Sequence, residues 1–188
     1  SAIVIASIAY LSWSYHRTDE SYSAFVSSDN RATLLLSRAN TSVHTAAYVA
    51  YKVLAYDAKA PEMQQLLGSF ADSSKQAIER FEAAKQRLPE AATAIDGMIG
   101  KAQAIFAELS KAVEFGSRNE NDAARPILAQ QDVAIIELRK MLGTFIDENT
   151  ASIDAQTEVL ANGTDFTIKS SLIALGFVLV AALAASLA

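Results

Sequence analysis

Residues 61–113 read PEMQQLLGSFADSSKQAIERFEAAKQRLPEAATAIDGMIGKAQAIFAELSKAV. This stretch decides the fold because its apolar residues recur every three or four positions, the spacing of one face of an α-helix. A Pro-Glu pair opens each half, at Pro61 and at Pro89, and proline is favoured in the first turn of a helix. The stretch therefore predicts two helices that meet at Pro89. Their predicted inward-facing residues are Met63, Leu66, Phe70, Ser74, Ala77, Phe81, Ala84 and Leu88, then Ile95, Met98, Ala102, Ile105, Leu109 and Ala112.

The same spacing continues on both sides of this stretch. Residues 17–60 predict a first helix, in which Asp29 is a gap in the apolar series. Residues 116–122 form a break, where Gly116 suits a C-terminal cap and Asn121 or Asp122 an N-terminal cap, and a fourth helix follows. The predicted inward-facing residues are Tyr22, Phe25, Ala32, Leu36, Ala39, Val43, Ala46, Ala50, Val53 and Leu54 in the first helix, and Leu128, Gln131, Ile135, Leu138, Leu142, Phe145, Asn149, Ser152, Gln156, Val159, Gly163 and Phe166 in the fourth.

Four amphipathic helices with short connections predict an all-α fold, an antiparallel up-down-up-down four-helix bundle. A fold with many strands needs frequent turns, and 7 Gly and 3 Pro in 188 residues supply few turn signals.

The two ends of the chain carry no charge. Residues 170–188 give about 19 uncharged residues, near the ~20 needed to cross a membrane. Tyr10, Trp13 and Tyr15 are typical of the aromatic belt at a membrane surface. We expect residues 1–16 to be a truncated first transmembrane helix, 17–168 an extracytoplasmic four-helix-bundle sensor domain, and 169–188 a second, truncated transmembrane helix, so that the chain is a fragment. A signal peptide is the alternative for the first segment, but a small-residue cleavage pattern is missing.

The amino-acid composition argues against several classes of function. A net charge of −5 argues against a nucleic-acid partner. The absence of Cys excludes disulfides, Cys-ligated metal clusters and a thiol nucleophile. The two His lie outside any Glu-x-x-His motif, and neither a Gly-rich phosphate loop nor a Gly-x-Ser-x-Gly motif occurs. We therefore expect no enzyme activity, no metal and no cofactor.

Polar residues occupy inward-facing positions of the fourth helix, at Gln131, Asn149, Ser152 and Gln156. Such residues cost stability but leave helices able to shift against one another, as a signalling helix must. The alternative is that they face a dimer partner or water.

The overall layout and two local patterns resemble one receptor family. Residues 121–128 read NDAARPIL, and Asp147-Glu148-Asn149 is followed by Ala151. Both are similar to stretches in the fourth helix of the sensor region of bacterial methyl-accepting chemotaxis receptors. The resemblance implies a homodimer in the inner membrane whose bundle faces the periplasm or cell exterior and binds a small molecule, or a periplasmic binding protein, near its membrane-distal end. Sensor histidine kinases and membrane cyclases share this module, and a scaffold or adaptor that binds a partner protein is a further alternative.

A ligand site is predicted on the first helix near this end. Four polar residues follow one another at intervals of four and share one face of this helix: Asn40, His44, Tyr48 and Lys52. A cation, an imidazole and two phenols could hold an organic, amino or aromatic acid, and a merely solvated face is the alternative. Gln130, Gln131 and Asp132 are expected at the level of Tyr48. The predicted ligand-binding residues are Arg38, Asn40, His44, Tyr48, Tyr51, Lys52 and Gln131.

Two arginines on the first helix have different expected roles. Arg31 is expected to pair with Asp147 or Glu148. Arg38 has no acid at its level, so it is an anion-site candidate or the partner of an acid in a second subunit.

Overall fold

The structure, a computed structural model, describes residues 29–187, with the backbone alone for residues 160–168, 170–172 and 174–187. All regular elements in this part of the chain are helices. The chain divides into two units, Ser28–Thr150 and Ser1–Ser27 with Ala151–Ala188. The predicted membrane segment 1–16 and the predicted helical residues 17–28 lie outside the described residues.

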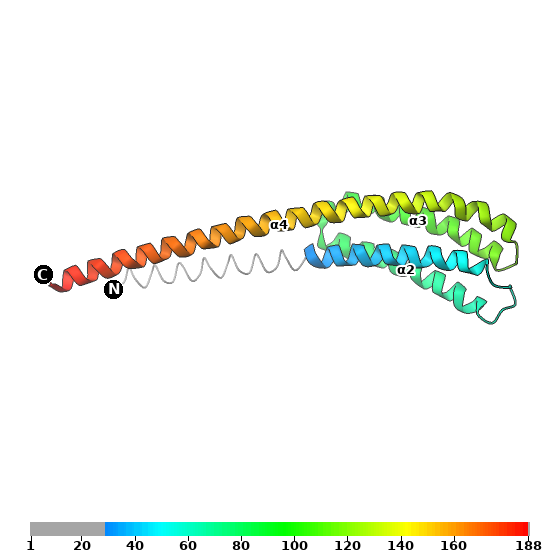
Figure 1. Ribbon diagram of the computed structural model, residues 1–188, viewed down its shortest axis with the longest axis horizontal. Helices are drawn as coiled ribbons and strands as arrows, with labels where there is room; N and C mark the ends of the chain where they lie inside the picture. Colours follow the sequence, from blue (N-terminus) through cyan, green and yellow to red (C-terminus); the bar gives the residue numbers. More distant parts are fainter. Residues whose placement is uncertain (1–28, 188) are drawn as a thin grey trace. The chain divides into compact units, whose positions relative to one another are not determined.

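Four helices and one short 3-10 turn make up the described chain (Figure 1). They are a first helix over residues 29–53, α2 (Met63–Arg87), the 3-10 turn η1 (Pro89–Ala91), α3 (Ala92–Gly116) and α4 (Asn121–Leu187). An all-helical fold is therefore confirmed, and it is compatible with a four-helix bundle.

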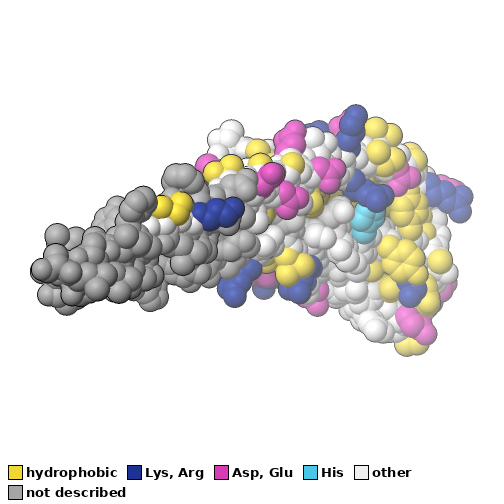
Figure 2. All heavy atoms as spheres, turned by 60° about the vertical axis from the view of Figure 1, so that its left-hand side comes forward, with side chains coloured by type: hydrophobic (Ala, Val, Ile, Leu, Met, Phe, Trp, Pro, Cys, Tyr) yellow, Lys and Arg dark blue, Asp and Glu magenta, His cyan; other side chains and the backbone are white. Residues whose placement is uncertain are grey.

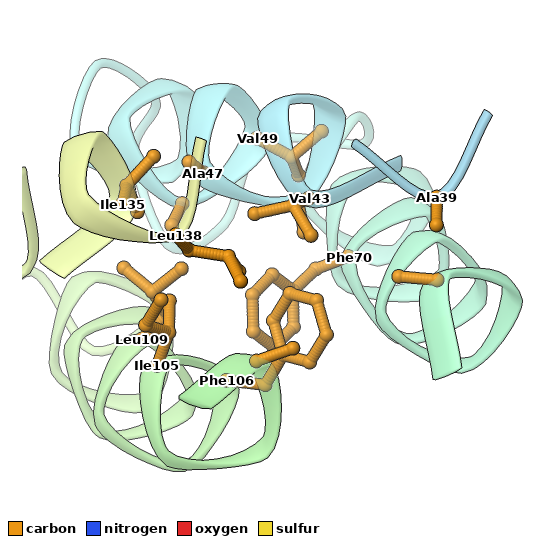
Figure 3. Close-up of a cluster of buried hydrophobic side chains, with 14 of the residues drawn as sticks. Ala39, Val43, Ala47, Val49, Phe70, Ile105, Phe106, Leu109, Ile135 and Leu138 are labelled. Atoms are coloured by element: carbon orange, nitrogen blue, oxygen red, sulfur yellow. The ribbon is translucent and has the colours of Figure 1, made fainter. Parts of the chain in front are cut away.

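All four helices contribute to one hydrophobic core in the unit Ser28–Thr150 (Figure 3). The first helix contributes mainly small side chains, whereas α2 and α3 contribute the phenylalanine rings. Small residues let helix backbones approach closely, and the larger rings fill the remaining space. Figure 3 labels Ala39, Val43, Ala47 and Val49 from the first helix, Phe70 from α2, Ile105, Phe106 and Leu109 from α3, and Ile135 and Leu138 from α4.

The predicted inward faces are the buried faces in the first three helices. Each predicted core residue from Ala32 to Val53 is buried, and so is each from Ile95 to Ala112. In α2 the buried serine is Ser73, whereas the predicted Ser74 is only half-buried. Asp29, the gap in the apolar series, is also buried, with 7% of its surface exposed.

The proline signals mark helix starts to within two residues. Helix α2 begins at Met63, two residues after Pro61. Pro89 is the first residue of η1, which leads directly into α3. The structure corrects the predicted role of Gly116, because this residue is the last of α3 and the left-handed conformation falls on Asn119, with φ 63°.

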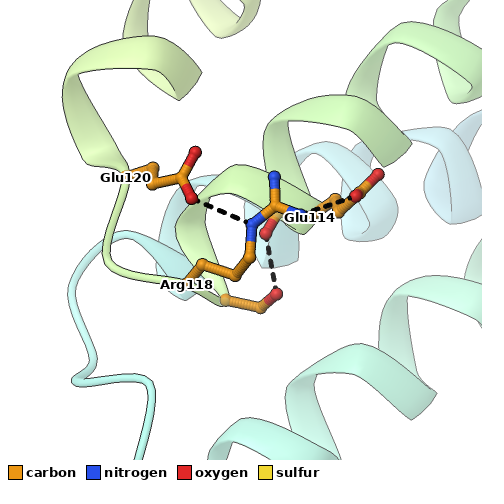
Figure 4. Close-up of polar contacts among 4 residues, drawn as sticks. Glu114, Arg118 and Glu120 are labelled. Carbon is orange, nitrogen blue, oxygen red and sulfur yellow. Dashed lines mark hydrogen bonds and ion pairs between the residues drawn. The ribbon is translucent and has the colours of Figure 1, made fainter.

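Side-chain hydrogen bonds tie together the two loops at one end of the unit, called the loop end below. Asn119 Oδ1 accepts a hydrogen bond of 2.8 Å from the Ala58 backbone N–H. Asn121 is already helical and donates to the Leu54 carbonyl oxygen at 3.0 Å. In the same loop Arg118 forms ion pairs with Glu114 at 2.9 Å and with Glu120 at 3.1 Å (Figure 4).

Helix α4 is continuous over 67 residues, from Asn121 to Leu187. Beyond Thr150 its predicted inward-facing residues Ser152 and Gln156 are exposed, and Gln156 donates to Ser152 Oγ at 3.2 Å. A search of the described residues found no helix with the length and apolar character needed to span a membrane.

Candidate functional site

Two hydrogen bonds set the register between the first helix and α4. Tyr51 O–H donates to Asp132 Oδ2 at 2.7 Å, and Asn149 Nδ2 donates to Thr33 Oγ1 at 3.0 Å. Tyr51 follows Thr33 in sequence and Asp132 precedes Asn149, so the two helices run in opposite directions. We call the strip between these bonds the polar seam. It consists of Thr33, Asn40, His44 and Tyr51 from the first helix and Asp132, Arg139 and Asn149 from α4.

Asn40 and His44 occupy the middle of the polar seam. Both side chains are half-buried. Asn40 Oδ1 and His44 Nε2 are shielded from solvent and have no hydrogen-bond partner in the described chain. Burial, followed by the positive charge of Arg139, lowers the pKa of His44. A neutral imidazole therefore lies beside an arginine at this level of the seam.

Tyr51 and Asp132 close the polar seam toward the loop end. Burial raises the pKa of the Tyr51 phenol to about 12, with further contributions from its hydrogen bond to Asp132 and from the negative charge of that carboxylate. Tyr51 is therefore protonated at neutral pH and acts as a hydrogen-bond donor. The sequence predicts Asp132, together with Gln130 and Gln131, at the level of Tyr48, which is three residues before Tyr51, so the observed register differs by up to about one helical turn.

The remaining predicted site residues lie away from the polar seam. Tyr48 is 65% exposed, and Gln131 is 7% exposed, on the buried side of α4. The Lys52 ammonium lies 5.7 Å from the centre of the Tyr56 ring. Arg38 is exposed, and its carbonyl oxygen accepts a hydrogen bond of 3.0 Å from Arg80 of α2. The structure thus brings Asn40, His44 and Tyr51 to one seam and leaves the other four outside it.

Two arginines make contacts that were not predicted from the sequence. Arg80 joins α2 to the first helix through the Arg38 carbonyl and Ser42 Oγ, and Arg139 lies near His44. Arg80 occurs at a partly buried helix position, which the apolar series skips. The signal for Arg139 is its spacing of seven residues from Asp132, because that spacing repeats a helix face.

Positive residues outnumber negative ones on the first helix. Residues 29–53 contain two Arg and one Lys but a single acid, Asp29. Within the described chain, none of the ion pairs involves the first helix, and none involves Arg139. The expected pairing of Arg31 with Asp147 or Glu148 is therefore absent from these contacts. Figure 2 shows basic and acidic side chains interspersed over the face of the molecule that it draws.

Large apolar side chains are exposed only on two helices in the described part of Ser28–Thr150. Helices α2 and α3 expose none of them. The first helix and α4 contribute Leu34, Tyr48, Tyr51, Val133 and Ile136.

Two open grooves lie on other faces. One, of about 500 Å³, runs between α3 and α4 over Met98, Met141 and Phe145. The other, of about 820 Å³, runs between α2 and α3 over Phe70 and Phe106. No group of three metal-ligating side chains occurs among the residues the structure describes. Compared with protein-family models, curated proteins and solved structures, the chain gives no match.

Proposed function

We propose that the chain is the ligand-sensing and signal-transmitting region of a bacterial chemoreceptor, a non-enzymatic protein of the inner membrane. In this proposal residues 1–16 and 169–188 cross the membrane, and the bundle between them has up-down-up-down topology and faces the periplasm or cell exterior. A small organic, amino or aromatic acid binds the bundle, either free or delivered by a periplasmic binding protein.

The continuity of α4 is the observation that carries this proposal. One helix holds the seam residues Asp132, Arg139 and Asn149 and continues to Leu187. A displacement of 1–2 Å at a ligand site, typical of helix shifts in receptors, would pass along this helix without crossing a loop. A ligand can drive such a shift only if it binds one arrangement of the helices more tightly than the other.

The chemistry of the polar seam supports relative movement of the two helices. The described hydrogen bonds across the seam, Tyr51 to Asp132 and Asn149 to Thr33, connect single side chains. Alanines 32, 39, 46 and 50 line the buried side of the first helix. Small side chains interlock less deeply than Leu or Ile, so a short displacement disturbs less packing.

Exposed apolar residues support a homodimer. They are confined to the first helix and α4 within the described part of Ser28–Thr150. Exposed apolar surface gathered on one face is typical of a protein–protein contact. We propose that two copies pair through this face, which would place the two polar seams near the dimer contact.

The experiment combines a ligand screen with a report of helix movement. The 188-residue chain, kept in detergent, is screened by thermal shift against amino acids, organic acids and aromatic acids. A ligand at 100 times its Kd adds about 2.7 kcal/mol to stability, which raises the melting temperature. Because the sequence has no Cys, an introduced pair is free of competing thiols.

The pair Thr33→Cys and Asn149→Cys reports on the polar seam, where the two native side chains are 3.0 Å apart. The control pair, Ala71→Cys and Ser110→Cys, lies on α2 and α3 at the edges of one groove. We expect a bound ligand to change the disulfide formation rate of the seam pair several-fold and leave the control pair unchanged. If no compound shifts the melting temperature, or if ligand leaves both rates unchanged, a scaffold that binds a partner protein replaces this proposal.

A further inference from the structure

The middle of the polar seam lacks hydrogen-bond partners that its two ends have. Asn40 Oδ1 and His44 Nε2 are one helical turn apart, and both are buried without a partner in the described chain. A buried polar atom left unpaired costs about 1–3 kcal/mol, and roughly nine in ten such atoms in proteins are paired. Two residues on one face of the first helix thus carry unsatisfied polar atoms.

The same place lacks a negative charge. Arg139 lies close enough to His44 to lower the pKa of the imidazole, and no described carboxylate pairs with its guanidinium. The one carboxylate of the polar seam, Asp132, already accepts the Tyr51 hydroxyl. A carboxylate would supply the missing negative charge and accept a hydrogen bond from an N–H of His44, and it can bond Asn40 only through the amide N–H, because Oδ1 is itself an acceptor.

We propose that the middle of the polar seam binds a small carboxylate, held by the Arg139 guanidinium and by an N–H of His44, with the Asn40 amide as a third contact. This inference rests on the proposed function and names the chemical class of its ligand.

The donor groups suit a carboxylate. Arg presents two parallel N–H groups to the two oxygens of a carboxylate. A neutral imidazole donates from Nε2 in one of its two tautomers, and an Asn amide presents N–H groups when it turns about its last bond. The three side chains therefore supply donors from both helices of the seam.

Burial of the unpaired atoms links binding to helix movement. Asn40 Oδ1 and His44 Nε2 are shielded from solvent, so a ligand that bonds to them must displace the groups that cover them. Tyr51–Asp132 and Thr33–Asn149 bracket the opening. A carboxylate bound at His44 and Arg139 would thus bind the wider arrangement of the seam more tightly than the closed one. Such a difference in affinity between two arrangements is what allows a ligand to shift the helices.

Isothermal titration of the whole 188-residue chain in detergent tests the proposal. The probes are sodium acetate and sodium benzoate, with sodium chloride used to keep the ionic strength constant and benzamide as the uncharged counterpart of benzoate. We expect at least one of the two carboxylates to bind and benzamide to give no heat beyond dilution.

Four variants distinguish carboxylate binding at the polar seam from a general effect of positive charge on affinity. Arg139→Gln should weaken carboxylate binding at least tenfold, and His44→Gln by a smaller factor. Lys140→Gln makes the same charge change one residue along α4, on the α3–α4 groove, and should stay within twofold of the parent chain. Arg139→Lys, which keeps the charge, should retain part of the affinity. Helix content and melting temperature, followed by circular dichroism, identify any variant that does not fold.

Three results would overturn the assignment: neither carboxylate binds, benzamide binds as well as benzoate, or Lys140→Gln loses as much affinity as Arg139→Gln. The screen and the cross-linking pairs distinguish this failure from failure of the proposed function. If an uncharged compound changes the seam cross-linking rate and no carboxylate does, sensing stands and the carboxylate site is wrong. If no compound of any class binds, both fail.

Discussion

At the scale of single residues, Gly116 sets how closely the end of α3 approaches the end of the first helix. A Cβ added at Gly116 would lie 2.9 Å from Val53 Cγ1 and 2.9 Å from Leu54 Cδ1. Both contacts are shorter than normal carbon–carbon packing, and Val53 is fully buried. We expect Gly116→Ala to lower the free energy of unfolding by about 1–3 kcal/mol, the usual cost of overpacking, as measured by urea denaturation.

A matched glycine on the same helix gives the control. Gly100 has open space around the position of an added Cβ. Gly100→Ala should therefore raise the free energy of unfolding by up to about 1 kcal/mol, because alanine is the better helix former. Equal effects of the two substitutions would show that helix propensity, and not close approach, governs Gly116.

Asp29 gives a pH dependence with a defined sign. Burial, followed by the negative charge of Glu90, raises the pKa of the Asp29 carboxyl above its ordinary value. The folded state then binds this proton more tightly than the unfolded state, so the contribution of Asp29 to stability falls as the pH rises through the raised pKa. We expect Asp29→Asn to be more stable than the parent chain at pH 7, and the difference to shrink toward pH 4.

Urea denaturation at several pH values measures this difference. Asp72→Asn, at an exposed position of α2, serves as the control and should change stability little at any of them. A stability difference for Asp29→Asn that stayed constant from pH 7 to pH 4 would contradict the assignment to the buried carboxyl.

At the scale of elements, Asn119 joins the two connections at the loop end. Its left-handed backbone, with φ 63°, turns the chain between α3 and α4, and its side chain bonds the backbone of Ala58 and the carboxylate of Asp57. Asn119→Ala should lower the free energy of unfolding by about 1–3 kcal/mol, since it removes the hydrogen bonds and disfavours the left-handed conformation.

Asn119→Gly separates the two contributions in the same thermal or urea melts. Glycine adopts positive φ freely, so this variant loses the side-chain bonds alone and should be destabilised less than Asn119→Ala. A larger loss for Asn119→Gly than for Asn119→Ala would show that backbone conformation does not limit this turn.

Helix faces could be predicted from the sequence because a spacing of three and four fixes which side of a helix is apolar. Leu36, Phe81 and Leu109 are fully buried where the pattern placed them. The pattern treats each position as apolar or polar, so it missed that the charged side chain of Asp29 is buried. It also gave no reason to expect that Gly116 is needed for close approach.

The register between helices could not be predicted in the same way. Periodicity is unchanged when one helix slides past another by one turn, and loop conformation then decides between the alternatives. Here Asn119 and Asn121 fix the loop end. Asp132 consequently lies opposite Tyr51 and not Tyr48, and Arg139 joins Asn40 and His44 in the polar seam.

At the scale of the whole molecule, the homodimer proposed above predicts which exposed apolar residues two copies would share. Val133 and Ile136 are 61% and 62% exposed on α4. We expect Val133→Glu with Ile136→Glu to weaken dimerisation at least tenfold, because a charged group at a contact must lose its water. Sedimentation equilibrium of the whole chain in detergent measures the dissociation constant.

The control for this prediction is Ala104→Glu with Ala107→Glu, which adds the same two charges, also three residues apart, at exposed positions of α3. It should leave the dissociation constant within twofold of the parent value. Dissociation by the α3 control variant, or an unchanged dimer in the α4 variant, would place the contact on another face.

The unbroken course of α4 has a consequence for angle as well as for distance. Each residue of an α-helix turns the chain by about 100° and advances it by about 1.5 Å. Seven residues of unbroken helix therefore make two turns to within about 20°, so Asp132 and Arg139 lie on one face of α4. One residue inserted between Asp132 and Arg139 would rotate Arg139 by about 100°, away from the face that Asp132 shares with Tyr51, whereas seven would restore the alignment to within about 20°.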